Sequence, residues 1–244
     1  MTIENYKKLI RLYVPEEGFA PEKKIPLSEG QAHYLRNVMR KEAGEQLRVF
    51  NGHDGEWLAL LEEINKKNAT IRLKRNLLLQ QPGSDILVLA SPVKKEAFDL
   101  MVEKACELGA ARFVPVTCEH TVVHKINQER LQLIAIEASE QSERLDVMTV
   151  EPLQSLKSCL SSKNYHRDTL FCVERTGVAS LAEAVRGLAG KPLAILIGPE
   201  GGFSAQEIDF INSFGYIHPV SLGPRILKAE TALITALSGV QLLS

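Results

Sequence analysis

The sequence lacks the features of secreted and membrane proteins. No apolar run approaches the roughly 18 to 20 residues that cross a bilayer, and the opening MTIENYKK is polar where a secretory signal would be apolar. The four cysteines stand far apart with no C-x-x-C pair, which argues against a disulfide framework and a zinc site. We therefore expect a cytoplasmic protein with reduced thiols, no membrane association and no metal.

The usual nucleotide-binding motifs are missing as well. Neither G-x-x-x-x-G-K-[ST] nor G-x-G-x-x-G after a strand occurs, so a P-loop or Rossmann cofactor is disfavoured. His120 and His124 have the spacing of H-E-x-x-H, but the intervening TVV holds no glutamate and we expect no metal there. The net charge of −1 gives no general sign of nucleic-acid binding. Residues 1–75 do carry a small basic excess, which favours them as the phosphate-facing part.

The pattern of the chain changes near residue 80. Before this point short apolar runs alternate with turn signals, NGHDG at 51–55 is typical of a hairpin loop, and one helix is expected near residues 28–40. After the linker QQPGSD, strands alternate with helices, which indicates a parallel α/β sheet. The strands are expected near residues 86–91, 112–117, 169–174, 193–198 and 217–222. We predict a small β-rich domain over residues 1–79 and an α/β domain over residues 80–244.

Two glycine-bearing loops near the C-terminal end indicate a binding site. In LAILIGPEGGFS, at 193–204, a buried strand ends at Gly198, and Gly201 and Gly202 allow positive φ and close approach of a ligand. Ser204 and Glu207 form a capping-box pattern for a helix that runs to about Phe214.

The second segment, YIHPVSLGPRILKAETA at 216–232, repeats this plan. It contains a strand to about Leu222, a turn at Gly223, and a helix from about Lys228. Ligands of open α/β sheets bind at the carboxyl ends of strands, which is where both loops are expected.

Both loops carry a resemblance to a known family. GPEGGFSAQEI at 198–208 and LGPRILKAETA at 222–232 resemble the two signature motifs of the RsmE-type ribosomal RNA uridine-N3 methyltransferases, of the SPOUT (trefoil-knot) class. The segments HYLRNVMRKEAGE, EKACELGA and EASEQSER, at 33–45, 103–110 and 137–144, resemble further family segments in the same order. Lys228 and Glu45 depart from the arginine and aspartate that the family usually has. A lysine keeps the charge but loses the bidentate geometry of arginine.

The resemblance implies a fold, a cofactor and partners. It implies a PUA-like β-barrel RNA-binding domain followed by a SPOUT-like, trefoil-knotted, parallel-sheet methyltransferase domain. It also implies a homodimer that acts on 16S ribosomal RNA, either naked or within the small ribosomal subunit. S-adenosylmethionine would lie in the two loops, against Ile197, Gly198, Glu200, Gly201, Gly202, Ser221, Leu222, Gly223, Ile226 and Leu227.

The chemistry of uridine N3 suggests catalytic candidates. N3 carries an imide proton, so a cation beside O2 or O4 would stabilise the charge that develops when this proton leaves, and Arg225 or Arg144 could supply it. Glu230 is either a general base or a partner that orients an arginine. Glu137, Gln141 and Arg144 are expected on one face of a helix. The expected RNA contacts are Arg11, His33, Arg36, Arg40 and Gln141.

Two other functions are compatible with the sequence. One is a non-catalytic RNA-binding protein in which the second domain only dimerises. The other is a methyltransferase that acts on another RNA or on another atom of the base.

Overall fold

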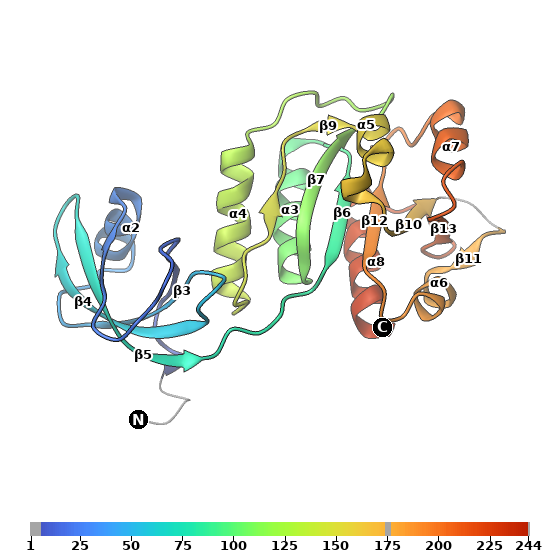
Figure 1. Ribbon diagram of the computed structural model, residues 1–244. Coiled ribbons are helices and arrows are strands. Elements are labelled where there is room, and N and C mark those ends of the chain that lie inside the picture. Colours follow the sequence, from blue (N-terminus) through green and yellow to red (C-terminus); the bar gives the residue numbers. More distant parts are fainter. Residues whose placement is uncertain (1–5, 174–176, 244) are drawn as a thin grey trace. The chain divides into compact units, whose positions relative to one another are not determined.

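The computed structural model describes residues 6–173 and 177–243. The chain forms two compact units (Figure 1). The first unit comprises residues 1–83 together with 139–147, and the second comprises residues 84–138 and 148–244. The short segment 139–147, which falls inside the α/β range expected from the sequence, thus packs with the β-rich unit.

The first unit is built on a five-stranded sheet with the order β1-β3-β4-β5-β2. Strand β1 pairs with β3 in parallel, and the other pairs are antiparallel. The strands are β1 (Arg11–Tyr13), β2 (Lys24–Leu27), β3 (Gln46–Phe50), β4 (Glu56–Ile64) and β5 (Ala69–Leu78).

A helical segment accompanies this sheet over residues 29–38, within the range 28–40 expected from the sequence. Helix α2 (Glu29–His33) begins with a capping box at Ser28 and continues as the π-helix η1 (Tyr34–Val38). Its fully buried Leu35 joins the sheet residues Leu47, Leu61 and Ile71 in one apolar core.

The second unit contains a sheet in which every pair of neighbouring strands is parallel. Its order is β11-β13-β10-β12-β6-β7-β8, and β9 pairs with β7. The five strands expected from the sequence are confirmed as β6 (Ile86–Ala90), β7 (Ala110–Thr117), β10 (Asp168–Val173), β12 (Leu193–Ile197) and β13 (Ile217–Ser221). The remaining strands are β8 (Thr149–Val150), β9 (Gln154–Ser155) and β11 (Ala179–Ser180).

Helices cover both faces of this sheet. Alternate residues of β6 and β12 face opposite sides, so Val88 and Ile195 belong to one apolar core and Leu87 and Leu196 to another. The first core includes residues of α3 (Lys95–Glu107), α4 (Gln128–Gln141), α6 (Leu181–Gly187) and α8 (Ala229–Leu243). The second includes residues of α5 (Leu156–Ser161), the 3₁₀ helix η2 (Lys163–Tyr165) and α7 (Ala205–Asn212).

The two helices that follow the glycine-bearing loops begin close to the expected positions. The Ser204 capping box is present at the start of α7, although the helix ends at Asn212 rather than Phe214. Helix α8 begins at Ala229 and buries Ala229, Leu233 and Leu237 on one face, as the periodicity predicts.

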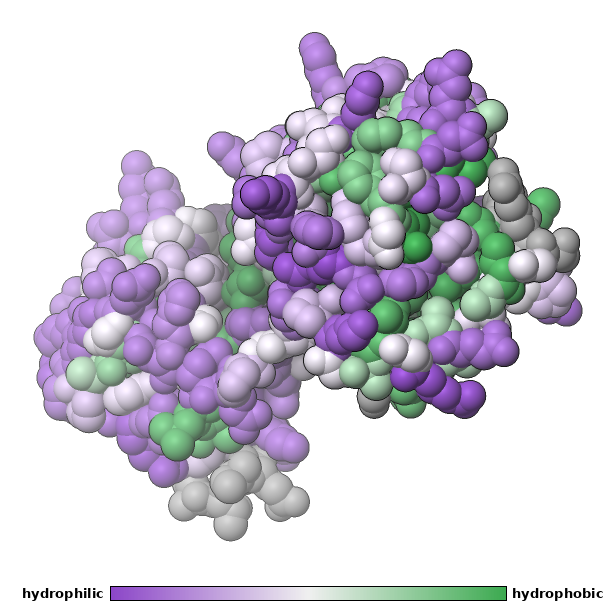
Figure 2. Space-filling view, turned by 45° about the vertical axis from the view of Figure 1, so that its right-hand side comes forward, coloured by the Kyte–Doolittle hydropathy of each residue, from purple (hydrophilic) through white to green (hydrophobic). Residues whose placement is uncertain are grey.

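The face of the molecule seen in Figure 2 is largely hydrophilic, with apolar patches exposed on both units. Within the described part of the chain, no helix has both the length and the apolar character needed to cross a membrane.

Candidate functional site

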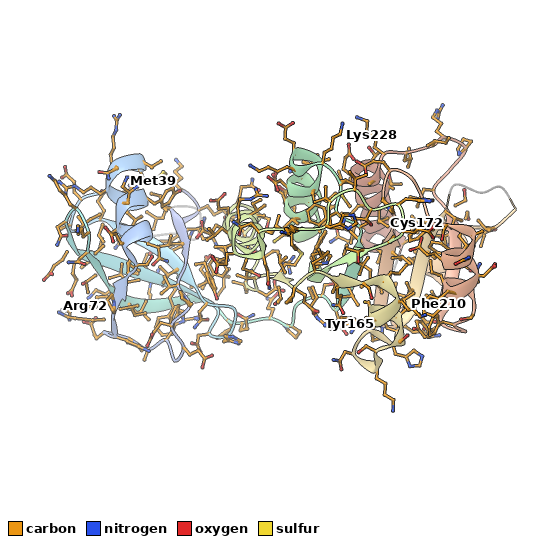
Figure 3. All side chains as sticks on the ribbon, turned by 90° about the horizontal axis from the view of Figure 1, so that it is seen from above. Met39, Arg72, Tyr165, Cys172, Phe210 and Lys228 are labelled. Atoms are coloured by element: carbon orange, nitrogen blue, oxygen red, sulfur yellow. The ribbon has the colours of Figure 1, made fainter. Side chains whose placement is uncertain are left out.

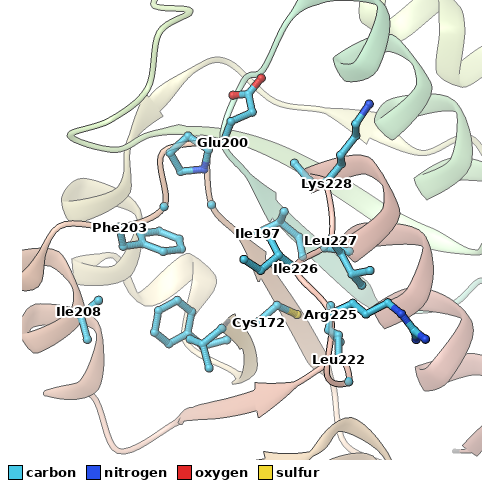
Figure 4. A pocket seen from close by; sticks show the side chains of 18 residues that line it. Cys172, Ile197, Glu200, Phe203, Ile208, Leu222, Arg225, Ile226, Leu227 and Lys228 are labelled. Carbon is cyan, nitrogen blue, oxygen red and sulfur yellow. The ribbon is translucent and has the colours of Figure 1, made fainter. Parts of the chain in front are cut away.

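A pocket of about 530 Å³ opens at the carboxyl ends of β10, β12 and β13. Cys172 and Lys228 mark its position in the second unit (Figure 3), and Figure 4 shows it from close by. Strand β10 pairs with β12 on one side and with β13 on the other, so the segments after β12 and β13 reach the same edge of the sheet. The volume is within the range of about 300–1,000 Å³ typical of small-molecule sites.

Two segments supply most of the pocket wall. We call residues 198–203 the first glycine loop and residues 222–228 the second glycine loop. Eight of the ten cofactor residues expected from the sequence line the pocket: Ile197, Gly198, Glu200, Gly202, Leu222, Gly223, Ile226 and Leu227. Gly201 and Ser221 fall outside the lining formed by the described residues. Ser221 instead braces the second glycine loop, because its Oγ accepts a hydrogen bond from the Gly223 N–H at 3.2 Å.

The glycines of these loops are required for different reasons. Gly202 has φ 67° and Gly223 has φ 118°, a region that side chains with a Cβ rarely adopt, so positive φ is confirmed at Gly202 and also occurs at the turn residue Gly223. The positive φ expected at Gly201 is wrong, since its backbone lies outside that region. A Cβ at Gly201 is excluded by a neighbour instead, because it would lie 2.9 Å from the Cβ of His120.

The interior of the pocket is apolar. Phe171 from β10 and Phe203 from the first glycine loop meet edge to face, with ring centroids 5.1 Å apart. Gly198 admits the Phe203 ring, which would lie 2.5 Å from a Cβ at that position. Cys172 also lines the pocket, and burial raises the pKa of its thiol to about 12, so it is neutral at physiological pH.

Sequence reasoning missed the contribution of β10 and the two apolar side chains Phe203 and Ile208. The motif spacing pointed to the loops after β12 and β13, but it carried no sign that β10 lies between these strands. Phe203 stands within the first motif, where its apolar character was the available signal.

Charged side chains occur at the rim of the pocket. Glu200 and Lys228 carry their charged ends outward, and the Arg225 side chain extends away from the apolar interior (Figure 4). All three residues are exposed. The pocket thus combines an apolar interior with one anionic and two cationic groups at its entrance.

The three catalytic candidates belong to different units. Arg225 lines the pocket and Glu230 lies half-buried in the first turn of α8, both in the second unit. Arg144 belongs to the first unit, where its guanidinium donates to Asp146 at 2.8 Å. Helix α4 ends at Gln141 and Glu143 has φ 60°, so the expectation that Arg144 continues the helical face of Glu137 and Gln141 is wrong.

Arg11 does not have the exposure that a phosphate contact requires. Its residue is 6% exposed, and its guanidinium donates to Glu56, to the Ser139 carbonyl at 2.7 Å and to the Arg144 carbonyl. The guanidinium carbon also lies 3.7 Å from the centre of the Phe50 ring. Burial lowers the pKa of Arg11. Arg11 therefore attaches the segment 139–147 to the first unit.

The other four RNA candidates are exposed. His33 ends α2 and Arg36 lies in η1, whereas Arg40 lies beyond the end of η1 at Val38, with a left-handed backbone of φ 53°. Gln141 is exposed at the end of α4. All four belong to the first unit. Their contact with RNA stays a prediction.

Comparison with known protein families defines the class of this chain. An RNA methyltransferase domain matches residues 80–241, and an RNA methyltransferase PUA domain matches residues 27–74. The chain is thus an RNA methyltransferase with a PUA domain, which confirms the fold class and the enzyme class expected from the sequence.

Two individual relatives identify the family within this class. The chain is 34% identical to the ribosomal RNA small subunit methyltransferase E of Rickettsia conorii, over 97% of this chain and 96% of the relative. It is 32% identical to the protein of the same name from Synechocystis, over 96% of this chain and 77% of the relative. The chain therefore belongs to the ribosomal RNA small subunit methyltransferase E family.

Solved structures agree with this assignment. A ribosomal RNA small subunit methyltransferase E from Neisseria gonorrhoeae bound to S-adenosyl methionine is similar with a TM-score of 0.84 and 27% identity, over 96% of this chain and 98% of that one. A methyltransferase of Legionella pneumophila with bound S-adenosylmethionine is similar with a TM-score of 0.80 and 30% identity, over 96% and 98% of the two chains.

Proposed function

We propose that this protein transfers the methyl group of S-adenosylmethionine to N3 of a specific uridine in 16S ribosomal RNA. The observation that carries the proposal is the pocket at the carboxyl ends of β10, β12 and β13. It is built from the two segments whose motifs resemble the family's signature motifs. Two similar solved structures carry S-adenosylmethionine.

The residues present suit this cofactor. The apolar interior around Phe171 and Phe203 suits an adenine ring, and the glycine loops leave backbone N–H and C=O groups open to a ligand. At the rim, Glu200 complements the amino group of the cofactor, and Lys228 complements its carboxylate. S-adenosylmethionine, when bound, supplies a methyl group on a positively charged sulfur, and the protein must bring a nucleophilic nitrogen to it.

On the substrate side, the chain must favour loss of the uracil N3 proton. Arg225 is exposed at the pocket, so its guanidinium is available to donate to a uracil oxygen and to stabilise the negative charge that develops. Glu230 either accepts the N3 proton or orients Arg225. Arg144 remains the second candidate for the stabilising cation.

RNA recognition is assigned to the first unit. Its exposed His33, Arg36, Arg40 and Gln141 offer cationic and polar groups to phosphates. N3 lies on the Watson–Crick edge of uracil, so the target base must be unpaired or splayed out, which fits single-stranded or junction RNA. The substrate is the 16S RNA, naked or within the small ribosomal subunit, in the cytoplasm.

We assign the trefoil knot of the SPOUT class and a homodimer to the second unit. Large apolar side chains are exposed there, as Figure 2 shows for one face, and such groups suit a second copy of the chain. They include Leu100, Val122, Leu133, Ile226 and Leu242.

A non-catalytic RNA-binding dimer is the alternative from another class, and a methyltransferase of another RNA position is the alternative within the class. Calorimetry with S-adenosylmethionine, followed by transfer of its labelled methyl group to 16S RNA and to small subunits and by identification of the methylated nucleoside, separates them. We expect cofactor binding and incorporation into at least one of the two substrates. Absence of cofactor binding would contradict the proposal and favour the non-catalytic dimer.

A further inference from the structure

A turn after β7, residues 118–121, is fixed in place by buried polar groups. The Thr121 hydroxyl accepts a hydrogen bond from the Cys118 N–H at 2.7 Å, and the Thr121 N–H donates to the Cys118 carbonyl at 3.1 Å. The same hydroxyl lies 2.7 Å from the hydroxyl of Ser91, just after β6. Ser91 and Thr121 are buried, and the Ser91 N–H donates to the Ile197 carbonyl at 3.0 Å. The turn is thereby tied to the end of β12, where the first glycine loop begins.

Two residues of this turn donate hydrogen bonds to the first glycine loop and to the start of α7, the helix that follows it. His120 Nδ1 lies 3.0 Å from the Gly201 carbonyl oxygen and 3.2 Å from that of Gly202. Carbonyl oxygens only accept, so Nδ1 carries the hydrogen and is shared between the two oxygens. In addition, the Glu119 N–H donates at 2.8 Å to the carboxylate of Glu207, the residue that closes the capping box of α7.

Gly201 makes the approach of His120 possible. A Cβ at this position would lie 2.9 Å from the Cβ of His120, closer than real Cβ atoms approach. Gly201 itself is outside the pocket lining that the described residues form. The absent side chain at 201 thus makes room for the histidine on the outer side of the loop.

We propose that His120 is a positioning residue for the cofactor, which holds the first glycine loop in the conformation that binds it. This rests on the proposed function, because the cofactor in question is S-adenosylmethionine. The loop contains the left-handed Gly202, and glycines leave the backbone many other conformations. If a hydrogen bond that favours the binding conformation is removed, a smaller fraction of molecules is competent, and the apparent affinity falls in proportion.

Three substitutions of similar shape separate the hydrogen bond from packing. His120→Asn keeps an N–H donor near the position of Nδ1, His120→Leu has no donor, and His120→Asp presents only acceptors to the two carbonyls. We expect the leucine and aspartate variants to bind S-adenosylmethionine about three- to tenfold more weakly, the contribution of one hydrogen bond. We expect the asparagine variant to remain within about twofold of the wild type.

Further readouts distinguish positioning from a general loss of structure. The thermal unfolding temperature and the turnover at saturating cofactor should be unchanged in all three variants. Only KM and Kd for the cofactor should rise, in the leucine and aspartate variants. The control is His124→Leu, at an exposed position four residues further along the same segment, and it should bind like the wild type.

A double substitution tests the link to Gly201. Gly201→Ala should weaken binding in the wild-type background, because it displaces His120, and should add no further loss in a His120→Gly background.

Equal binding by wild type and His120→Leu, or equal weakness of the asparagine and leucine variants, would overturn the inference while leaving the proposed function intact. The inference would also be overturned if Gly201→Ala weakened cofactor binding equally in the wild-type and His120→Gly backgrounds. A wild-type protein that binds no S-adenosylmethionine would contradict the proposed function and this inference together.

Discussion

At the scale of single residues, the reason for glycine could be predicted at position 202 but not at positions 198 and 201. Gly202 and Gly223 have left-handed backbones, whereas Gly198 and Gly201 make room for Phe203 and His120. Positive φ is a local property that a turn pattern can suggest. The approach of His120 depends on a residue some eighty positions away in the chain, and such a contact has no local signal.

The left-handed backbone of Gly202 leads to a direct test. Gly202→Val should abolish S-adenosylmethionine binding, because a β-branched side chain at φ 67° is strained and would occupy the ligand's approach. Calorimetry measures the binding, and circular dichroism checks the fold. Gly190→Val is a matched control, since Gly190 has φ 76°, has open space around its missing Cβ and lies outside the described pocket lining. If the Gly202 variant binds as the wild type does, the first glycine loop is not part of the site.

Arg225→Ala should reduce turnover far more than it reduces binding. Its proposed role is to stabilise charge that appears only as the N3 proton leaves, so we expect a loss on the order of 10²- to 10³-fold in single-turnover rate. Arg225→Lys should recover part of this rate. Methylation at saturating RNA and cofactor across a pH series provides the measurement, and the alanine variant should recover as N3 ionises at higher pH. An equal deficit at every pH would make Arg144 the better candidate.

The cysteines should react slowly in the folded protein. Burial disfavours the thiolate and raises the pKa of Cys118, Cys159 and Cys172 to about 12, above the roughly 8.5 of an unfolded thiol. At pH 8 their thiolate fraction is then on the order of 10⁻⁴. Because only the unfolded state ionises between these two pKa values, the stability that these thiols contribute falls as the pH rises above about 8.5. Titration with a disulfide reagent at pH 8 should be slow in the native state and rapid in denaturant, and rapid native reaction at the buried Cys118 or Cys159 would contradict the assigned burial.

At the scale of elements, periodicity predicted the long strands and helices and missed the short or interrupted ones. Strand β2 contains Pro26, which is a poor strand former but is tolerated at this edge position. Strands β8, β9 and β11 have two residues each, too few to show an alternating pattern. The end of α4 was missed because the spacing of Glu137, Gln141 and Arg144 is compatible with a longer helix, and the left-handed Glu143 interrupts it.

Arg36 in η1 and Arg40 just after its end allow a test of RNA contact. Charge reversal at Arg36 and Arg40 should weaken RNA binding and leave S-adenosylmethionine binding unchanged, since the exposed arginines lie in the first unit and the pocket lies in the second. For every phosphate that the variant no longer neutralises, the salt slope of log K should fall in magnitude by roughly 0.7 to 0.9.

Reversal of Lys66 and Lys67 is the matched control for this experiment. Both lysines are exposed in the turn between β4 and β5 of the same unit, and their reversal makes the same change in net charge. If the two double variants change the slope equally, the effect comes from the overall charge of the unit and not from contacts of Arg36 and Arg40.

At the scale of the whole molecule, the family was readable from motifs spread over nearly the full chain, and the family and structural comparisons confirm it. The assignment of residues 139–147 to the first unit could not be predicted from the sequence. It rests on long-range contacts, among them the hydrogen bonds from the buried Arg11 to the carbonyls of Ser139 and Arg144 and the ion pair of Arg48 with Glu143. The trefoil knot and the homodimer stay predictions, since neither threading nor association is encoded in periodicity.

Mass mapping of the modified nucleosides in 16S ribosomal RNA tests the proposed reaction itself. RNA from a strain that lacks this gene should be missing one 3-methyluridine. Purified protein with S-adenosylmethionine should restore it at the same position, whereas the Gly202→Val variant should not. An unchanged set of modifications in the mutant strain, or restoration of a methyl group at an atom other than N3 of uridine, would contradict the proposed function.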